Sequence, residues 1–201
     1  MDKNNSISEL LGRSDIYLID QIMKERYAQG DKILDAGCGG GRNMHWFLQN
    51  NIEIYGIDAS DAAIINLRNK YPLLPAENLQ VSLVEKLPFP DHFFNHVISS
   101  AVLHFATSSL HFKGMIGEMV RVLKPGGTLF IRMTSDIGIT DKVKLLSNGN
   151  YQIPDGSMRF LLTKPLLAEI MEQFNLLFLE PLKTVNVNDV RCMSTLMLQK
   201  K

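Results

Sequence analysis

A glycine-rich segment, Asp35-Ala36-Gly37-Cys38-Gly39-Gly40-Gly41-Arg42, follows a short apolar run and precedes a helical pattern. Glycine has no side chain to keep a ligand away from the backbone, so a ligand can lie against Gly37, Gly39 and Gly41. Amide N–H groups at the start of a following helix favour negative charge, so the turn could bind a carboxylate or a phosphate. The turn therefore predicts a cofactor site and leaves the kind of anion open.

A carboxylate at Asp58 stands 21 positions after Gly37, at the end of the next predicted strand. A carboxylate at this position can accept hydrogen bonds from both hydroxyls of a ribose. The dinucleotide pattern G-x-G-x-x-G would require glycine where this chain has Arg42. Asp35 would also repel a pyrophosphate and attract an ammonium group. A nucleotide-dependent oxidoreductase is therefore the weaker alternative.

Three residues further along could act on a second molecule. His104 follows a predicted strand, and with an ordinary pKa of about 6.5 it could take a proton, or it could simply pack under a lid. Arg132 ends a predicted strand at the same sheet edge, and with Arg159 it could clamp an anionic acceptor through forked hydrogen bonds. The alternative is that each arginine pairs with a nearby acid, such as Asp136 or Asp155.

Other reactive side chains near the glycine turn are given more ordinary roles. Arg13 precedes a predicted helix and could reach a cofactor carboxylate or lie on the surface. Cys38 is expected to pack in the turn, because no general base stands near it in sequence. His45 and His111 are expected to be solvated helix residues.

Strands and helices alternate along most of the chain. We predict strands at 32–36, 52–57, 79–84, 97–100, 128–133, 176–184 and 193–199, and helices at 14–28, 42–49, 61–69, 115–123 and 164–174. Residues 124–127 are expected to form a turn. The short connection 186–189 favours antiparallel pairing of the last strand. The pattern predicts an α/β fold, a Rossmann-like, doubly wound α-β-α sandwich around a mostly parallel seven-stranded sheet with an antiparallel last strand.

The 201 residues suit one domain, with an N-terminal helical segment at 1–29 and a lid at 135–160. In the helical segment, Ser14 is expected to cap the helix and Gly30 to end it. Residues 135–159 are polar and lack a strong period, and long loops of this kind are usually functional or mobile.

Composition limits the partners and the compartment. The 21 basic residues balance the 21 acidic ones, which argues against a nucleic-acid partner. Cys38 and Cys192 give neither a disulfide framework nor a zinc site, so no metal is expected. Residues 1–10 lack a targeting pattern and no run of 18 apolar residues occurs, so we expect a cytoplasmic protein without a membrane partner. A monomer or a homodimer is expected.

Three motifs stand in the order seen in class I S-adenosylmethionine-dependent methyltransferases. They are Ile33 to Arg42, Leu87-Pro88-Phe89-Pro90-Asp91 with Phe94, and Arg121-Val122-Leu123-Lys124-Pro125-Gly126-Gly127. Three other stretches resemble small bacterial methyltransferases of the tellurite-resistance type: Leu11-Gly12-Arg13, Phe130-Ile131-Arg132 and Pro154 to Phe160. The chain thus resembles this enzyme family most clearly over residues 30–133.

The resemblance implies S-adenosylmethionine as cofactor and S-adenosylhomocysteine as product. It places the methionine part on Gly37 to Gly41, the ribose on Asp58, and the adenine beside Val84 and Glu85. The remaining residues that we expect at the cofactor are Arg13, Asp35, Cys38, Arg42, Ala59 and Ser100.

Two residues depart from the family pattern. Relatives often have an aspartate near Leu83 that holds the adenine amino group, so here that contact must come from elsewhere or be lost. Asn95 stands where the family usually has an aspartate, and its role is expected to be structural.

The resemblance implies in-line transfer of a methyl group from the sulfonium. The cofactor supplies the activated carbon, so the protein chiefly positions the nucleophile and excludes water. The size of the chain favours a small-molecule acceptor, and Arg132 and Arg159 favour an anionic one. The alternative is a protein that binds S-adenosylmethionine or its product without catalysis, as a sensor or a partner of another enzyme.

Overall fold

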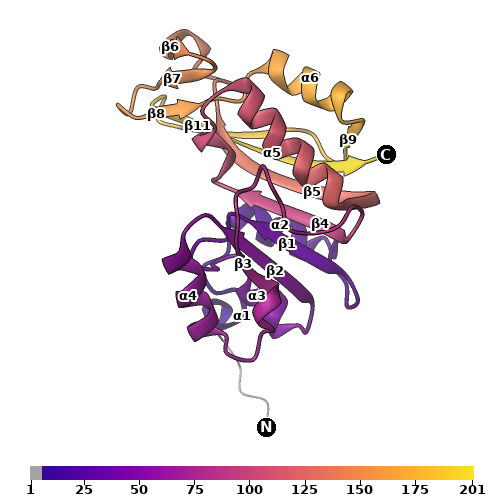
Figure 1. Ribbon diagram of the computed structural model, residues 1–201. Coiled ribbons are helices and arrows are strands. Elements are labelled where there is room, and N and C mark those ends of the chain that lie inside the picture. Colours follow the sequence, from indigo (N-terminus) through magenta and orange to yellow (C-terminus); the bar gives the residue numbers. More distant parts are fainter. Residues whose placement is uncertain (1–5) are drawn as a thin grey trace.

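The computed structural model describes residues 6–201, which form one large and one small β-sheet with helices on both faces of the large one (Figure 1). The strands of the large sheet are β1 (Lys32–Ala36), β2 (Glu53–Asp58), β3 (Leu79–Val81), β4 (Phe94–Ser100), β5 (Leu123–Ser135), β9 (Leu176–Phe178), β10 (Lys183–Val187) and β11 (Arg191–Lys200). Their order is β10-β11-β5-β4-β1-β2-β3, and β9 also pairs with β11. Strands β1 to β5 pair in parallel and β11 is antiparallel to β5. The predicted fold class and the antiparallel last strand are confirmed.

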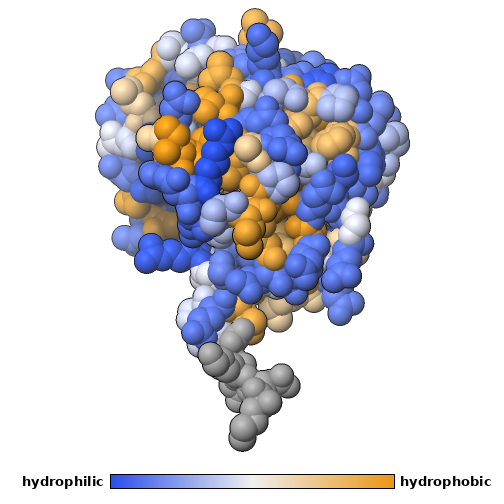
Figure 2. Space-filling model, turned by 60° about the horizontal axis from the view of Figure 1, so that its bottom comes forward, coloured by the Kyte–Doolittle hydropathy of each residue, from blue (hydrophilic) through white to orange (hydrophobic). Residues whose placement is uncertain are grey.

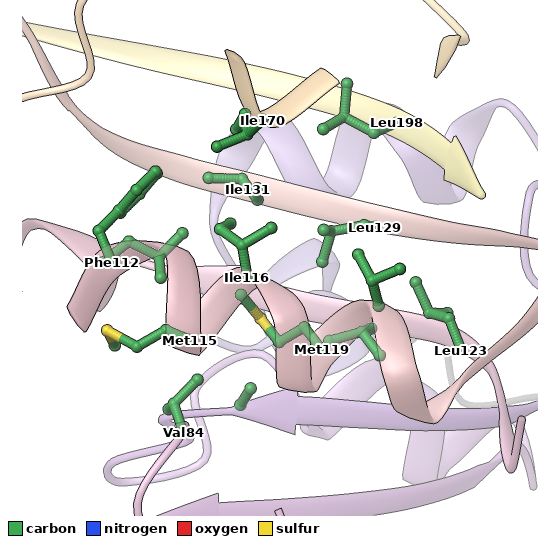
Figure 3. Packing of buried hydrophobic residues seen from close by; sticks show 14 of the residues in the cluster. Val84, Phe112, Met115, Ile116, Met119, Leu123, Leu129, Ile131, Ile170 and Leu198 are labelled. Atoms are coloured by element: carbon green, nitrogen blue, oxygen red, sulfur yellow. The ribbon is translucent and has the colours of Figure 1, made fainter. Parts of the chain in front are cut away.

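Neighbouring residues of the central strands belong to two different cores, because successive side chains of a strand point to opposite faces. Ile33 and Phe130 pack with the helices of one face, whereas Leu34 and Leu129 pack with those of the other. The helices of the first face are α2 (Ile16–Met23), α3 (His45–Gln49) and α4 (Asp61–Lys70), and those of the second are α5 (Ser109–Val122) and α6 (Lys164–Gln173). Figure 3 shows α5 laying its apolar side chains against β5 and β11.

The large sheet has eight strands rather than the predicted seven. The predicted strand 176–184 is divided into β9 and β10, which pair with successive parts of β11. Pro181 lies in the interruption, and proline has no N–H to donate to a neighbouring strand. Two other predicted elements differ in length, since β3 ends at Val81 and α5 begins at Ser109, where Ser108 accepts a hydrogen bond from the amide of His111.

The N-terminal segment contains two short helices, α1 (Ile7–Leu11) and α2. The prediction that Ser14 caps α2 is wrong: the Asp15 carboxylate accepts from the amide of Tyr17, 3.0 Å away, and caps the helix. Ser14 donates instead to the carbonyl of Leu11. The helix ends at Met23, well before Gly30, so that prediction was also wrong.

Helix α3 begins at His45 and not at Arg42 as predicted. Residues 41–44 form turns that precede the helix. With only 5 residues, α3 contributes little dipole, and the expected attraction of an anion to its N-terminus is not supported.

The predicted turn at 124–127 is a bulge within β5. Leu123 pairs with Phe94 and Thr128 pairs with His96, so four residues of β5 lie opposite Asn95 alone. The side-chain oxygen of Asn95 accepts from the amide of Lys32, 3.1 Å away, which fits the structural role expected of it.

Residues 135–160, predicted to be a lid and called the lid segment below, are more regular than their sequence indicates. The lid segment contains a three-stranded antiparallel sheet, formed by β6 (Lys144–Ser147), β7 (Asn150–Gln152) and β8 (Met158–Phe160), which lies beyond one end of the large sheet (Figure 1). The expectation of an irregular loop was therefore wrong. Phe160 anchors the segment, because its ring is fully buried and stacks on Phe112 of α5 at 5.0 Å between centroids.

Hydrophobic side chains reach the surface in several patches separated by polar ones (Figure 2). Within residues 6–201, no helix combines the length and the apolar character needed to cross a bilayer.

Candidate functional site

The glycine turn after β1 is fixed by β2 and by the segment that follows β4. The amide of Gly37 donates to the carbonyl of Ile57 at 2.9 Å. Gly37 has φ of 84°, and a Cβ placed there would lie 2.4 Å from Cγ2 of Val102, so only glycine fits. A Cβ on Gly39 or Gly40 would meet nothing within 4 Å, so this side of the turn faces space that a ligand can fill.

Asp58, at the end of β2, is held by the turn itself. One carboxylate oxygen accepts from the amide of Gly39 at 2.8 Å and the other from the amide of Ser60 at 2.9 Å. Because the group remains partly exposed, its remaining lone pairs can accept hydrogen bonds from a ligand.

Asp35 is buried under the turn, with 1% of its surface exposed. Its Oδ2 atom has no hydrogen-bond partner among the residues that the structure describes. The pKa of Asp35 is raised to about 7, mainly by burial. The charge of Arg42 acts to lower this pKa and the charge of Asp58 acts to raise it. The site therefore holds a carboxyl group that a nearby cation would drive to ionise.

Two cavities flank the glycine turn. The first, of about 820 Å³, is lined by Arg13, Gly37, Cys38, Gly39, Gly40, Gly41, Arg42, His45, Lys70, Ser100 and Ala101. The second, of about 450 Å³, is lined by Gly37, Gly39, Asp58, Ala59, Ser82, Leu83, Val84, Glu85, Ala101, Val102, Phe105, His111 and Met115. Every residue predicted at the cofactor lines one of these cavities, except Asp35, which lies beneath the turn.

A third cavity, of about 510 Å³, brings together all three residues predicted to act on a second molecule. We call it the arginine cavity; it is lined by Arg42, Ala101, His104, Phe105, Arg132, Thr134, Arg159, Val187, Val190, Arg191 and Met193. The sequence predicted His104, Arg132 and Arg159 for this function but did not indicate Arg191 or Phe105.

Ala101 lines all three cavities and follows the last residue of β4. Its φ is 64°, a left-handed conformation that is uncommon for alanine and often found at functional sites. The amide of Ala101 donates to the carbonyl of Arg132 at 2.8 Å, which holds this corner of the backbone to β5. An alanine gives no sign of this role in the sequence.

Asp15 links the glycine turn to the arginine cavity, a role that no pattern in the sequence indicates. Only 2% of its side chain is exposed. Its Oδ2 atom lies 3.0 Å from Oγ of Ser100, 3.3 Å from Nη1 of Arg132 and 3.4 Å from Nη2 of Arg42. One carboxylate is thus shared by two guanidinium groups of the arginine cavity, and one of them, that of Arg42, also lines the first cavity.

His104 is buried and neutral. Burial, together with the charges of Arg159, Arg191 and Arg132, lowers its pKa to about 4. Its Nδ1 atom has no partner within residues 6–201, and its ring packs edge-on against Phe105 at 4.5 Å. Near neutral pH the ring can therefore take part in a hydrogen bond without carrying a positive charge, but its low pKa disfavours the role of proton acceptor that the sequence suggested.

The ion pairs suggested as alternatives for Arg132 and Arg159 are not the ones that form. Asp155 pairs with Arg191, at 2.7 Å from Nη2 and 2.8 Å from Nε. Arg159 has no acidic partner in the described part of the chain; it donates to the carbonyl of Met158 and lies 5.4 Å from the centroid of the Phe105 ring.

Two histidines expected to be solvated have partners instead. Nε2 of His45 lies 2.8 Å from the carbonyl oxygen of Glu9, which ties α1 to α3. Nε2 of His111 lies 3.2 Å from a carboxylate oxygen of Glu85, although without hydrogen-bond geometry. Cys38 is buried as expected, and burial raises the pKa of its thiol, which makes it a poor nucleophile. In residues 6–201, no group of three His, Cys, Asp or Glu side chains is placed to bind a metal ion.

Comparison with known proteins finds a family match for the segment that contains most of the residues around the glycine turn. Residues 34–131 match the family described as "Methyltransferase domain". The chain is 37% identical over 98 residues to an uncharacterized methyltransferase, sll0829, of Synechocystis, which is 49% of this chain and 44% of that protein. It thus spans less than half the length of that relative.

Solved structures share the fold over nearly the whole chain. The PH0226 protein of Pyrococcus horikoshii is 17% identical with a TM-score of 0.70, over 97% of this chain and 96% of that one. A 1,6-didemethyltoxoflavin-N1-methyltransferase of Burkholderia thailandensis, solved with bound 1,6-didemethyltoxoflavin and S-adenosylhomocysteine, is 16% identical with a TM-score of 0.67, over 92% of this chain and 76% of that one. The narrower resemblance to the tellurite-resistance type stays a prediction.

Proposed function

Since residues 34–131 are a methyltransferase domain of the class I, S-adenosylmethionine-dependent family, we propose that this chain transfers a methyl group from that cofactor to a small anionic acceptor. The observation that carries the proposal is the meeting of three cavities at Ala101. Two of them follow the glycine turn, where a cofactor can lie. The third is the arginine cavity, where an acceptor can lie.

The residues along the glycine turn fit the functional groups of the cofactor. Oδ2 of Asp35, which is buried and has no hydrogen-bond partner in the described part of the chain, suits the ammonium group. Arg13 suits the carboxylate, and Asp58 is placed for the ribose. In the second cavity, Leu83 and Met115 supply apolar surface for the adenine, so recognition of its amino group passes to neighbours other than residue 83.

When bound, the cofactor supplies a methyl group on a positively charged sulfur, which needs no further activation. The protein must therefore bring the nucleophile into line with that carbon and keep water away. Ala101 lies between the cofactor cavities and the arginine cavity. Its left-handed backbone is held against β5 by the hydrogen bond from its amide to the carbonyl of Arg132. Arg132 and Arg159 bind and orient the acceptor, and neutral His104 offers it a hydrogen-bond partner.

Two substitutions separate the cofactor side from the acceptor side. Asp58→Ala removes the proposed ribose contact and the acceptor of the Gly39 hydrogen bond, so affinity for S-adenosylhomocysteine should fall by about tenfold or more. Arg132→Ala should leave that affinity within about threefold and reduce turnover. Calorimetric titration and a methyl-transfer assay with a panel of small anions measure the two effects.

The titration should include NAD as a control ligand. Binding of both adenosyl ligands and not of NAD supports the proposal, whereas failure of the wild-type protein to bind either adenosyl ligand would refute it. Equal loss of cofactor affinity in both variants would contradict the division of roles. Tight cofactor binding without turnover of any acceptor would favour a non-catalytic binding protein.

A further inference from the structure

The arginine cavity has more positive charge than its acidic neighbours compensate. Four guanidinium groups line it: those of Arg42, Arg132, Arg159 and Arg191. No aspartate or glutamate lines it, and in the described part of the chain only two carboxylates lie within ion-pair distance of these arginines.

The two carboxylates leave specific charges uncompensated. Asp155 pairs closely with Arg191, so that arginine carries no excess charge. Asp15 is shared by Arg42 and Arg132 at 3.4 Å and 3.3 Å, so one positive charge remains on this pair. The other excess charge is on Arg159, which only donates to a backbone carbonyl.

The excess charge of the shared pair is available to the arginine cavity at Arg132, because Arg42 also lines the first cavity whereas Arg132 lines neither of the other two. The two charged groups lie against different aromatic rings. The Arg132 guanidinium lies 5.2 Å from the centroid of the Tyr17 ring, and that of Arg159 lies 5.4 Å from the centroid of the Phe105 ring. They also come from different sheets, since Arg132 is in β5 and Arg159 is in β8. Two fixed forks favour two separate carboxylates over one compact anion.

The rest of the lining adds no charge and little polarity. His104 is neutral, and Val187, Val190 and Met193 provide an apolar wall. A volume of about 510 Å³ suits a small molecule.

We propose that the methyl acceptor is a small dicarboxylate, with one carboxylate bound by Arg132 and the other by Arg159 across an apolar middle. This inference rests on the proposed function, and it names the class of acceptor that the arginine cavity takes. In the transfer, the bond between the methyl carbon and sulfur breaks and its electron pair stays on sulfur. A lone pair of the acceptor forms the new bond, and any proton on the nucleophile passes to water.

The test is calorimetric titration of the protein saturated with S-adenosylhomocysteine. The probes are malonate, succinate and glutarate, with propionate and butyrate as monocarboxylates and inorganic phosphate as a compact anion. At least one dicarboxylate should bind about tenfold more tightly than either monocarboxylate. Equal binding of mono- and dicarboxylates would overturn the inference, and so would tighter binding of phosphate than of every dicarboxylate.

Variants identify the arginines responsible. Arg159→Gln and Arg132→Gln should each remove the preference for dicarboxylates, whereas Lys144→Gln should keep it. Lys144 is the matched control, because it is an exposed cation of the same lid segment that does not line the arginine cavity. If the Lys144 variant lost the dicarboxylate preference equally, the preference would depend on the overall positive charge of the protein and not on these two arginines. That result would overturn the proposal.

Each variant is first titrated with S-adenosylhomocysteine, whose retained affinity reports that the fold is intact. If Arg132→Gln loses it, Arg159→Gln decides the outcome, since Arg159 makes few contacts. Failure of the wild-type protein to bind S-adenosylhomocysteine would contradict the proposed function. Binding of that ligand without a dicarboxylate preference would overturn this inference alone.

Discussion

Asp35 should make cofactor binding depend on pH. Burial raises its pKa to about 7, with Arg42 and Asp58 acting in opposite directions. An ammonium group can pair only with the ionised carboxylate, so binding below pH 7 must displace a proton. The affinity for S-adenosylhomocysteine should therefore fall by up to about tenfold for each pH unit between pH 7 and pH 5. Calorimetric titrations across this range measure the slope.

The control is Asp35→Asn, which has no group to titrate at this position. It should bind the ligand weakly, with little change between pH 7 and pH 5. If this variant keeps the pH dependence of the wild type, another group is responsible and the pairing of Asp35 with the ammonium is wrong.

Residues whose roles depend on near neighbours in sequence could be predicted, and those that depend on distant partners could not. The glycine turn and Asp58 follow from local spacing, and the structure places them around shared cavities. Asp15 stands 27, 85 and 117 positions from Arg42, Ser100 and Arg132. No pattern along the chain relates these residues, so only the fold indicates their contact.

At the scale of elements, the lid segment should depend on a single aromatic anchor. Phe160 is fully buried and stacks on Phe112. Phe160→Ala should lower the free energy of unfolding by about 3–5 kcal/mol, because it leaves a cavity between β8 and α5. Urea denaturation measures the change.

Met158 provides the control on the same strand. It is 67% exposed, so Met158→Ala should change the free energy of unfolding by less than about 0.5 kcal/mol. A similar loss in both variants would mean that the strand as a whole, and not the buried ring, stabilises the segment.

Buried strands were recognised in the sequence, whereas exposed strands were not. The five parallel strands have long apolar runs or clear turn boundaries, and their existence was predicted correctly. All four residues of β6 are exposed, so no alternation of apolar and polar residues marks it. The division at Pro181 was overlooked because apolar residues continue on both sides of it.

At the scale of the molecule, one ion-pair cluster joins the N-terminal segment to the region between β9 and β10. Glu180 accepts hydrogen bonds from Lys24, Arg26 and Lys183, and 12% of its side chain is exposed. Burial alone would raise the pKa of Glu180, but the hydrogen bonds from these cations hold it well below its usual range. The carboxylate is therefore charged wherever the protein is folded near neutral pH.

Since the folded pKa is lowered, the stability from Glu180 is present above pH 4.5 and is lost as pH falls below it. Glu180→Gln should lower the melting temperature at pH 7 and reduce its fall between pH 5 and pH 3, as followed by calorimetry. Glu169→Gln is the matched control, because within residues 6–201 Glu169 pairs only with Lys113 and its side chain is 53% exposed. Identical melting curves for the wild type and the Glu180 variant at pH 7 would show that the cluster does not stabilise the fold.

The two buried thiols allow local opening of the structure to be measured at two places. Cys38 lies in the glycine turn and Cys192 in β11, both are buried, and burial raises the pKa of each. An alkylating reagent can therefore modify either one only after the surrounding chain has transiently opened. The two labelling rates, measured separately by mass spectrometry, report the opening free energies of the cofactor end and the C-terminal strand. The chain thus contains its own pair of reporters for whether these regions open together or one at a time.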